Sequence, residues 1–282
     1  MNSNNSDIEY EYYRTYDPNA TTEVDLNDFL QNYFSFINKF FNYIKTNKQI
    51  IHEKFCAKIQ DRLSNDLISY NFDLGHSLLN KIRENIPFLN QYPLFLKLVF
   101  KYYDFQEIKE LDHGKYKIGF IKFLKAKHMV LYHFLKTLEE ILGRDIAIQL
   151  YKDFILYNVR TTDKEKQKMA CSEARKSYVK FWAECGGFNF AIYDFDEDMW
   201  VAKFDKCVWH ESMKDVEDQE IANYVVCYPG TINTFYLNVY VIKKTSQTLF
   251  QGDICDELYF SRNVHIDPVS PSQEFLRKLV VK

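Results

Sequence analysis

The chain has 282 residues, of which 46% are hydrophobic and 27% are charged. That length suits one large domain or two small ones, and these fractions are typical of globular proteins, which excludes wholesale disorder. The 36 basic and 39 acidic side chains leave a net charge of -3, which argues against a basic nucleic-acid binder and a polybasic membrane-surface protein. Because no apolar run approaches the roughly 18 residues of a spanning helix, and no signal-peptide core is present, we expect a cytoplasmic protein without a membrane partner.

Helical periodicity dominates the first two thirds of the chain. Residues 1–24 are polar and acidic and predict a flexible arm. Asp25 has the chemistry of an N-cap, and apolar residues then recur at helical spacing. The same spacing predicts helices over residues 26–44, 49–63, 65–85, 92–110, 120–142, 145–157 and 172–183. Gly143 supplies a stop between two of them, and residues 25–187 therefore form the expected helical region.

The last third changes to a period of two, which is typical of strands. The pattern predicts strands over residues 188–193, 199–209, 237–245 and 254–260, with a short helix over 217–227 that ends at Pro229-Gly230. Residues 188–262 then form an α+β region, and residues 263–282 form a tail. We expect an α+β fold in which helices precede a C-terminal antiparallel sheet with a short connecting helix, in one compact unit with no strand before residue 110.

The cysteines and glycines exclude several common sites. No C-x-x-C pair occurs among the six cysteines, so neither a zinc ribbon nor a thioredoxin-like site is supported. The chain also lacks G-x-G-x-x-G and G-x-x-x-x-G-K-[ST], which excludes nucleotide binding by those two motifs. Cys56, Cys171 and Cys185 are interpreted as small buried core residues. A reducing compartment would leave all six as thiols.

Three other cysteines fall at matched places in the α+β region. Cys207 lies on the second predicted strand, Cys227 at the end of the short helix, and Cys255 on the last strand. We expect these three to converge on one pocket and Cys56 not to join them. On the last strand, alternation directs Cys255, Glu257 and Tyr259 to one face.

Polar residues accompany the three cysteines. His210 and Glu211 follow Cys207, and Asp253 precedes Cys255. All three could transfer protons in a reaction. Alternatively, His210 and Glu211 lie in a solvated loop, and Asp253 shapes a turn. His128 and His133 lie five apart on a predicted helix, which places them on different faces and favours packing or surface roles.

The cysteine frame resembles that of the L-2-amino-thiazoline-4-carboxylic acid hydrolase family. The frame consists of Cys207, Cys227 and the stretch Thr248-Leu249-x-x-Gly252-Asp253-x-Cys255-Asp256. The segment Leu138-Glu-Glu-Ile-Leu-Gly143-Arg-Asp-Ile-Ala is also similar to the family's helix–glycine–helix junction, and the resemblance covers roughly residues 115 to 262. It implies a helical region before a C-terminal sheet. It also implies hydrolysis of 2-amino-thiazoline-4-carboxylate, a small cyclic amidine, to N-carbamoyl-cysteine.

That resemblance gives a set of candidate catalytic residues: Cys207, Cys227, Cys255, His210, Glu211 and Asp253. A thiolate nucleophile assisted by a carboxylate or histidine is one mechanism, and water activated by a divalent metal ion is the other. Gly230 stands where the family commonly has an acid, and Glu257 where it favours an aromatic residue. These two positions favour the alternative function, a non-catalytic small-ligand-binding or scaffold protein that keeps the fold. The oligomeric state is not predicted.

Overall fold

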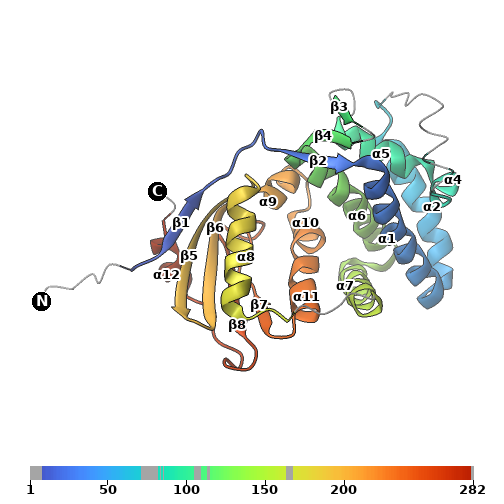
Figure 1. Ribbon diagram of the computed structural model, residues 1–282. Helices are drawn as coiled ribbons and strands as arrows, with labels where there is room; N and C mark the ends of the chain where they lie inside the picture. Colours follow the sequence, from blue (N-terminus) through green and yellow to red (C-terminus); the bar gives the residue numbers. More distant parts are fainter. Residues whose placement is uncertain are drawn as a thin grey trace, which may run out of the picture. The chain divides into compact units, whose positions relative to one another are not determined.

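A computed structural model describes residues 8–70, 82, 84, 86–104, 109–112, 115–162 and 168–280. The chain forms two compact units rather than the expected one. The sheet unit comprises Met1–Ala20, Val159–Lys214 and Val226–Lys282, and the helical unit comprises Thr21–Asn158 and Asp215–Val225. Because the chain passes between them several times, each unit combines segments distant in sequence. Figure 1 labels the elements of both units.

The helical unit contains most of the helices predicted for the first two thirds. Its helices are α1 (Leu26–Asn47), α2 (Gln49–Asp66), α4 (Phe88–Gln91), α5 (Pro93–Tyr103), α6 (Phe120–Leu142), α7 (Arg144–Thr161, which runs just past the unit) and α10 (Gln219–Val226). Asp25 caps α1 as predicted, its carboxylate accepting from the Asp28 amide at 3.0 Å. Gly143 ends α6 with a φ of 82°, a backbone angle that favours glycine. Most of the helix predicted over 65–85 lies outside the described residues.

Aromatic rings fill the core of this unit. Phe40, Phe41, Phe55 and Phe134 are almost entirely buried, and their rings contact one another across α1, α2 and α6. The high aromatic content of the chain therefore supplies packing here, as expected for large apolar side chains.

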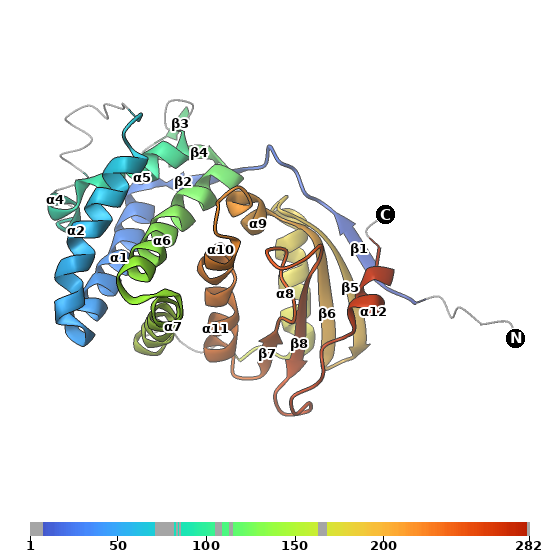
Figure 2. The same cartoon turned by 180° about the vertical axis from the view of Figure 1, so that it is seen from behind.

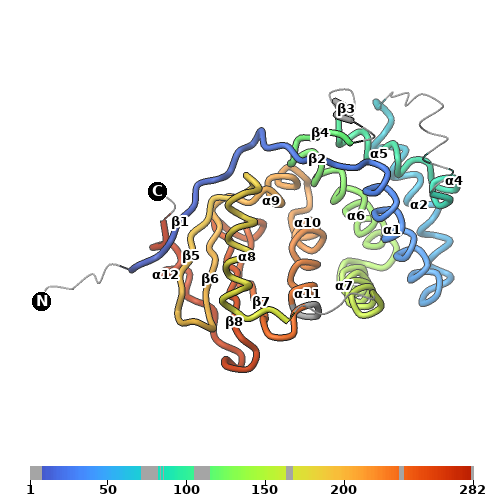
Figure 3. Tube along the Cα trace, viewed as in Figure 1, coloured from blue at the N-terminus to red at the C-terminus, as the bar shows by residue number. Residues whose placement is uncertain are grey.

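Strands before residue 110 contradict one expectation. The helical unit has a small antiparallel sheet in the order β2 (Thr21–Asp25), β4 (Lys115–Gly119) and β3 (Lys109–Asp112). The N-terminal arm is not flexible over its described residues either, because β1 (Glu11–Arg14) pairs antiparallel with β5 (Phe188–Asp196). Figure 3 shows this segment along the β5 edge. Short polar strands were missed because their stability comes from pairing with distant partners, which local patterns do not reveal.

The sheet unit confirms the C-terminal antiparallel sheet and the α+β class. Its strand order is β1-β5-β6-β8-β7, with β6 (Met199–Cys207), β7 (Val241–Lys244) and β8 (Cys255–Ser261), so β1 and β7 are the edges (Figure 2). Its helices are α8 (Cys171–Glu184), α9 (Val208–Met213), α11 (Tyr228–Leu237) and α12 (Gln273–Lys278). The short connecting helix is α10, which ends at Val226, close to the predicted bound, but Pro229-Gly230 lies in a second helix, α11, that was not predicted. Proline fits the first turn of α11, where its missing N–H has no intrahelical partner.

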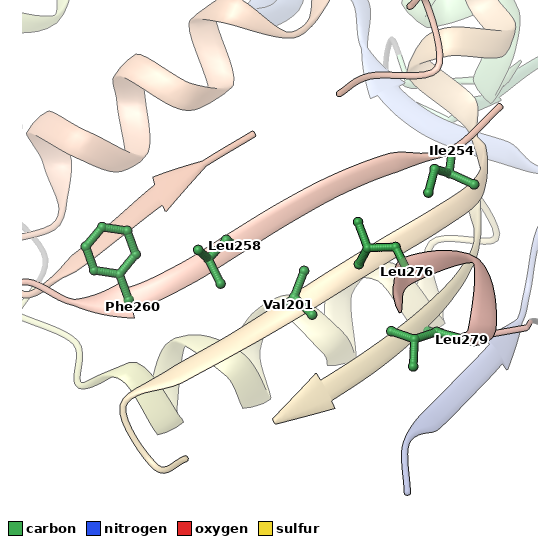
Figure 4. Packing of buried hydrophobic residues seen from close by; sticks show 7 residues of the cluster. Val201, Ile254, Leu258, Phe260, Leu276 and Leu279 are labelled. Carbon is green, nitrogen blue, oxygen red and sulfur yellow. The ribbon is translucent and has the colours of Figure 1, made fainter. Parts of the chain in front are cut away.

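The two faces of this sheet are packed differently. On one face, Trp182 of α8 contacts the rings of Phe190, Trp200 and Phe204. On the other face, α12 of the predicted tail packs into a cluster of buried apolar residues. Figure 4 shows its Leu276 and Leu279 turned toward Val201 on β6. The α8 face is the one that carries Cys255, which pairs with Phe204 across the ladder.

Candidate functional site

An irregularity in β6 sets the position of Cys207. Phe190 pairs with Phe204, whereas its neighbour Asn189 pairs with Lys206, so Asp205 is an extra residue on β6. Such a bulge reverses the alternation of the residues after it. Cys207, opposite Phe188, therefore lies on the same face as Phe204.

Cys255 shares this face with Cys207. It pairs with Phe204 across the β6–β8 ladder, and Glu257 and Tyr259 follow on the same side by alternation. Lys243 on β7 pairs with Tyr259 and joins them. The common orientation of Cys255, Glu257 and Tyr259 is the one that the sequence pattern predicted.

Glu257 is the centre of a polar cluster on this face. Its Oε1 lies 2.7 Å from Lys243 Nζ, and its Oε2 accepts from the Tyr259 hydroxyl at 2.5 Å. The side chains of Lys243 and Glu257 are only 9% and 19% exposed, so the ion pair is held in a poorly solvated environment. Contact with Glu257 raises the pKa of Lys243 although burial opposes its charge.

Helix α11 brings Cys227 to the same set. Cys227 immediately precedes α11, and Gly230 in its first turn is so close to Lys243 that a Cβ there would lie 3.6 Å from the Lys243 Nζ. Tyr178 of α8 hydrogen-bonds Thr234 of α11 and lies within the electrostatic reach of Lys243. The sheet and two helices thus surround one ion pair.

The three thiols share Glu257 and Lys243 as electrostatic partners. Desolvation is the main cause that raises the pKa of Cys207 to about 12, and it also raises the pKa values of Cys227 and Cys255. In each case Glu257 raises the thiol pKa further, and Lys243 opposes it. Cys207 further raises the pKa of Cys227, and Cys207 and Cys227 together further raise the pKa of Cys255. All three are therefore protonated at neutral pH.

Cys207 differs from the other two through its backbone surroundings. It directly precedes α9, and the amides of Trp209 and His210 lower its thiol pKa in opposition to desolvation. Donors at the start of a helix favour a negative charge. Of the three sulfurs, Cys207 is consequently the one best placed to carry a developing thiolate.

The side chains of His210 and Glu211 make other contacts. The His210 ring packs edge-on against Phe250, with centroids 4.8 Å apart, and burial lowers its pKa. The Glu211 carboxylate binds Lys214 Nζ at 2.7 Å and accepts from Tyr16 at 3.4 Å. The main electrostatic partners of the Cys207 thiol are Glu257 and Lys243 instead. Glu211 thus ties the N-terminal segment to α9.

Asp253 is part of the turn before β8. Its carboxylate is 64% exposed and pairs with Arg277 of α12 at 3.0 Å. This placement agrees with a turn and a surface ion pair rather than with proton transfer beside the thiols.

The remaining three cysteines lie on or beside α2 and α8, and all six cysteines are free thiols. Cys171 is buried at the start of α8, and Cys185 is half-buried just after its end. Cys56 lies on α2 in the helical unit, half-buried beside His52 and Tyr92. His128 and His133 of α6 are both buried, which agrees with the predicted packing role and not with the surface role.

Within the described part of the chain, no group of three or more His, Cys, Asp or Glu side chains is arranged to hold a metal ion. Across the same residues, no helix combines the length and the apolar character that a bilayer crossing requires. Comparison with protein-family models, curated proteins and solved structures finds no match to this chain.

Lys243 was not among the residues predicted for the site, and Glu257 was predicted to share a face with Cys255 but not to take part in the chemistry. The period of two on each strand was the available signal, since it places both on the cysteine face. Their pairing depends on the order of β6, β8 and β7, which local sequence patterns do not determine.

Proposed function

We propose that the sheet unit is a hydrolase for a small, carboxylate-bearing heterocycle with C–N and C–S bonds, such as 2-amino-thiazoline-4-carboxylate. The observation that carries this proposal is the Lys243–Glu257 pair, which acts electrostatically on the thiols of Cys207 and Cys255 on one sheet face and of Cys227 at the start of α11. The cysteine frame resembling that of the hydrolase family supports the choice of substrate class. We place the reaction in the cytoplasm, where free thiols persist.

In the proposed reaction, Cys207 is the nucleophile. Glu257 takes the thiol proton as Cys207 Sγ forms a bond to the ring carbon between nitrogen and sulfur. The C–S bond of the ring then breaks, and the departing sulfur takes a proton from Lys243 or Tyr259. The proton held by Glu257 passes to the ring nitrogen. Water next adds to the same carbon, and one of its protons restores the group that protonated the departing sulfur. Its other proton passes to Cys207 Sγ as the bond from that sulfur to the carbon breaks, which leaves N-carbamoyl-cysteine and the original thiol.

Each supporting residue has a physical reason for its role. Lys243 provides a buried positive charge, which attracts a substrate carboxylate and stabilises a departing thiolate. The amides of Trp209 and His210 lower the thiol pKa of Cys207 and so favour the attacking form. Cys227 and Cys255 line the same polar set and are proposed to shape the substrate site. The six original candidates thus reduce to Cys207 with Cys227 and Cys255 beside it.

One observation favours the alternative, a small-ligand-binding protein without turnover. All three thiol pKa values are raised, so the resting protein holds neutral thiols rather than nucleophiles. In this alternative, Lys243 and Tyr259 bind a carboxylate-bearing ligand and no bond is broken.

The test is substrate-dependent release of thiol from 2-amino-thiazoline-4-carboxylate by the purified full chain. We expect release by the wild type, loss in Cys207→Ser, and retention in Cys185→Ser, a matched substitution of a half-buried cysteine whose thiol pKa is set by burial and by local backbone hydrogen bonds. Adding Zn²⁺, Mn²⁺ or chelator separates the metal mechanism from the thiol mechanism. No release above the Cys207→Ser background under any of these conditions, together with measurable ligand binding, would favour the binding alternative.

A further inference from the structure

A glycine of α11 lies beside the buried lysine of the sheet unit. A Cβ added to Gly230 would lie 3.6 Å from Lys243 Nζ. Apart from the glycine's chain neighbours and its own helix backbone, no other heavy atom of the described residues would lie within 4 Å of that Cβ. Gly230 is exposed, whereas the Lys243 side chain is only 9% exposed. An exposed residue without a side chain thus borders a buried ammonium group.

The backbone does not require a glycine at this position. Among the described residues, only Gly143 and Gly186 combine glycine with a positive φ, and Gly230 lies in the first turn of α11. Glycine in a helix is less stable than alanine, because it loses more conformational freedom on folding. The Cβ of an alanine would meet Lys243 at an ordinary contact distance rather than clash with it. What an alanine at position 230 would remove is the space beside the ammonium.

The Lys243 ammonium has donors to spare for a ligand. A lysine side chain carries three N–H donors. Within the part of the chain that the structure describes, its one hydrogen-bond acceptor is Glu257 Oε1, at 2.7 Å. Buried polar groups normally have partners for their hydrogen bonds, so the remaining donors favour a bound acceptor at this place.

The charges of the site change during the proposed reaction in a way that suits a carboxylate. In the resting protein, Glu257 balances the charge of Lys243, and its second oxygen accepts from the Tyr259 hydroxyl at 2.5 Å. When Glu257 takes the proton of Cys207, it becomes neutral and Lys243 loses its balancing charge. Lys243 then attracts a neighbouring carboxylate more strongly than before. An interaction that strengthens as the reaction proceeds accelerates the reaction.

We propose that Gly230 is a specificity-determining residue, whose missing side chain leaves room for the substrate carboxylate beside Lys243 Nζ. This inference rests on the proposed function, which supplies the class of substrate. It holds equally for ligand binding without turnover, because seating the carboxylate changes no covalent bond. A side chain at position 230 therefore selects against ligands that carry a carboxylate.

Calorimetric titration of the purified full chain with L-thiazolidine-4-carboxylate tests this inference, with the carboxamide of the same ring as the neutral counterpart. This saturated ring lacks the amidine carbon and is not a substrate for the proposed hydrolysis. We expect the wild type to prefer the carboxylate. Gly230→Ala should weaken its binding at least about tenfold, because a methyl group then occupies the space that the carboxylate needs. The unfolding temperature of Gly230→Ala should stay the same or rise, because alanine favours a helix.

Two further variants make the test specific. Gly230→Asp should abolish the preference for the carboxylate over the carboxamide, because its own carboxylate then pairs with Lys243. Gly119→Ala is the matched control in the helical unit, where an added Cβ would lie 3.8 Å from the nearest atoms of Lys122. It should leave the affinity for the carboxylate unchanged.

Three results would overturn the proposal. The first is no preference of the wild type for the carboxylate at millimolar concentrations, and the second is equal affinity of the wild type and Gly230→Ala for it. The third is weaker binding by Gly230→Ala together with a lower unfolding temperature, which would mean that alanine disturbs α11. Failure of the hydrolase proposal has a different signature. The carboxylate then binds and responds to Gly230→Ala, but no thiol is released from 2-amino-thiazoline-4-carboxylate.

Discussion

Lys243 Nζ lies 2.7 Å from Glu257 Oε1 on a sheet face that also carries Cys207 and Cys255. Burial costs each of the two charges part of its hydration energy. The attraction between them offsets this cost only while both charges are present. Glu257 raises the pKa of each neighbouring thiol, and Lys243 lowers it. The ion pair therefore contributes both to the stability of the sheet unit and to the thiol reactivity that we propose for Cys207.

Breaking this ion pair from one side should destabilise the sheet unit. Glu257→Gln leaves the Lys243 charge without its partner, and we expect the free energy of unfolding to fall by about 3 kcal/mol. The double variant Lys243→Met/Glu257→Gln should recover part of the loss because no isolated charge remains. Urea denaturation of the single and double variants measures both values. Equal stability of Glu257→Gln and wild type would show that the pair is effectively solvated.

The contact between α12 and the sheet should also contribute to stability. Leu276 is fully buried in the cluster of apolar residues, and Leu276→Ala should lower the free energy of unfolding by about 2–4 kcal/mol through lost burial and a cavity. Ile266 is 95% exposed and provides the control. Ile266→Ala should change stability by less than about 0.5 kcal/mol. Similar effects of the two substitutions would mean that α12 is not docked on the sheet in solution.

Acidification should destabilise the helical unit through His133. Burial lowers its pKa to about 4, and the charges that face it are Asp66, Arg62 and Lys101. In the unfolded chain the pKa of histidine is about 6.5, so the unfolded state binds more protons between these values. The stabilising contribution is thus complete above pH 6.5 and is lost as the pH falls toward 4. Thermal unfolding between pH 7 and 4 should show a shallower decline for His133→Gln, and an identical decline would contradict this assignment.

The sequence predicted the regular elements better than their partners. The helix over 120–142 was predicted with the bounds of α6, because apolar spacing and a glycine stop act locally. The strand pairing of residues 11–14 with β5 was not predicted, since it joins segments far apart in the chain. The helix predicted over 217–227 is α10, whereas α11 was not predicted, because proline can begin a helix as well as end one.

The candidate site was predictable only in part. Alternation on β8 identified the common face of Cys255, Glu257 and Tyr259, whereas the extra residue Asp205 that directs Cys207 to this face has no sequence signature of its own. His210 and Glu211 were selected for their nearness in sequence to Cys207. In the fold, their side chains contact Phe250, Lys214 and Tyr16.

The most direct test of the central claim is the thiol reactivity of Cys207 when each charge of the pair is removed. Alkylation rates at this residue, followed by mass spectrometry from pH 8 to 10, report its thiolate fraction. Glu257 raises its thiol pKa and Lys243 lowers it. We therefore predict faster alkylation of Cys207 in Glu257→Gln and slower alkylation in Lys243→Met, with Cys185 unchanged in both variants. Shifts of the same sign in the two variants, or no shift in either, would contradict the claim that this ion pair controls the thiol.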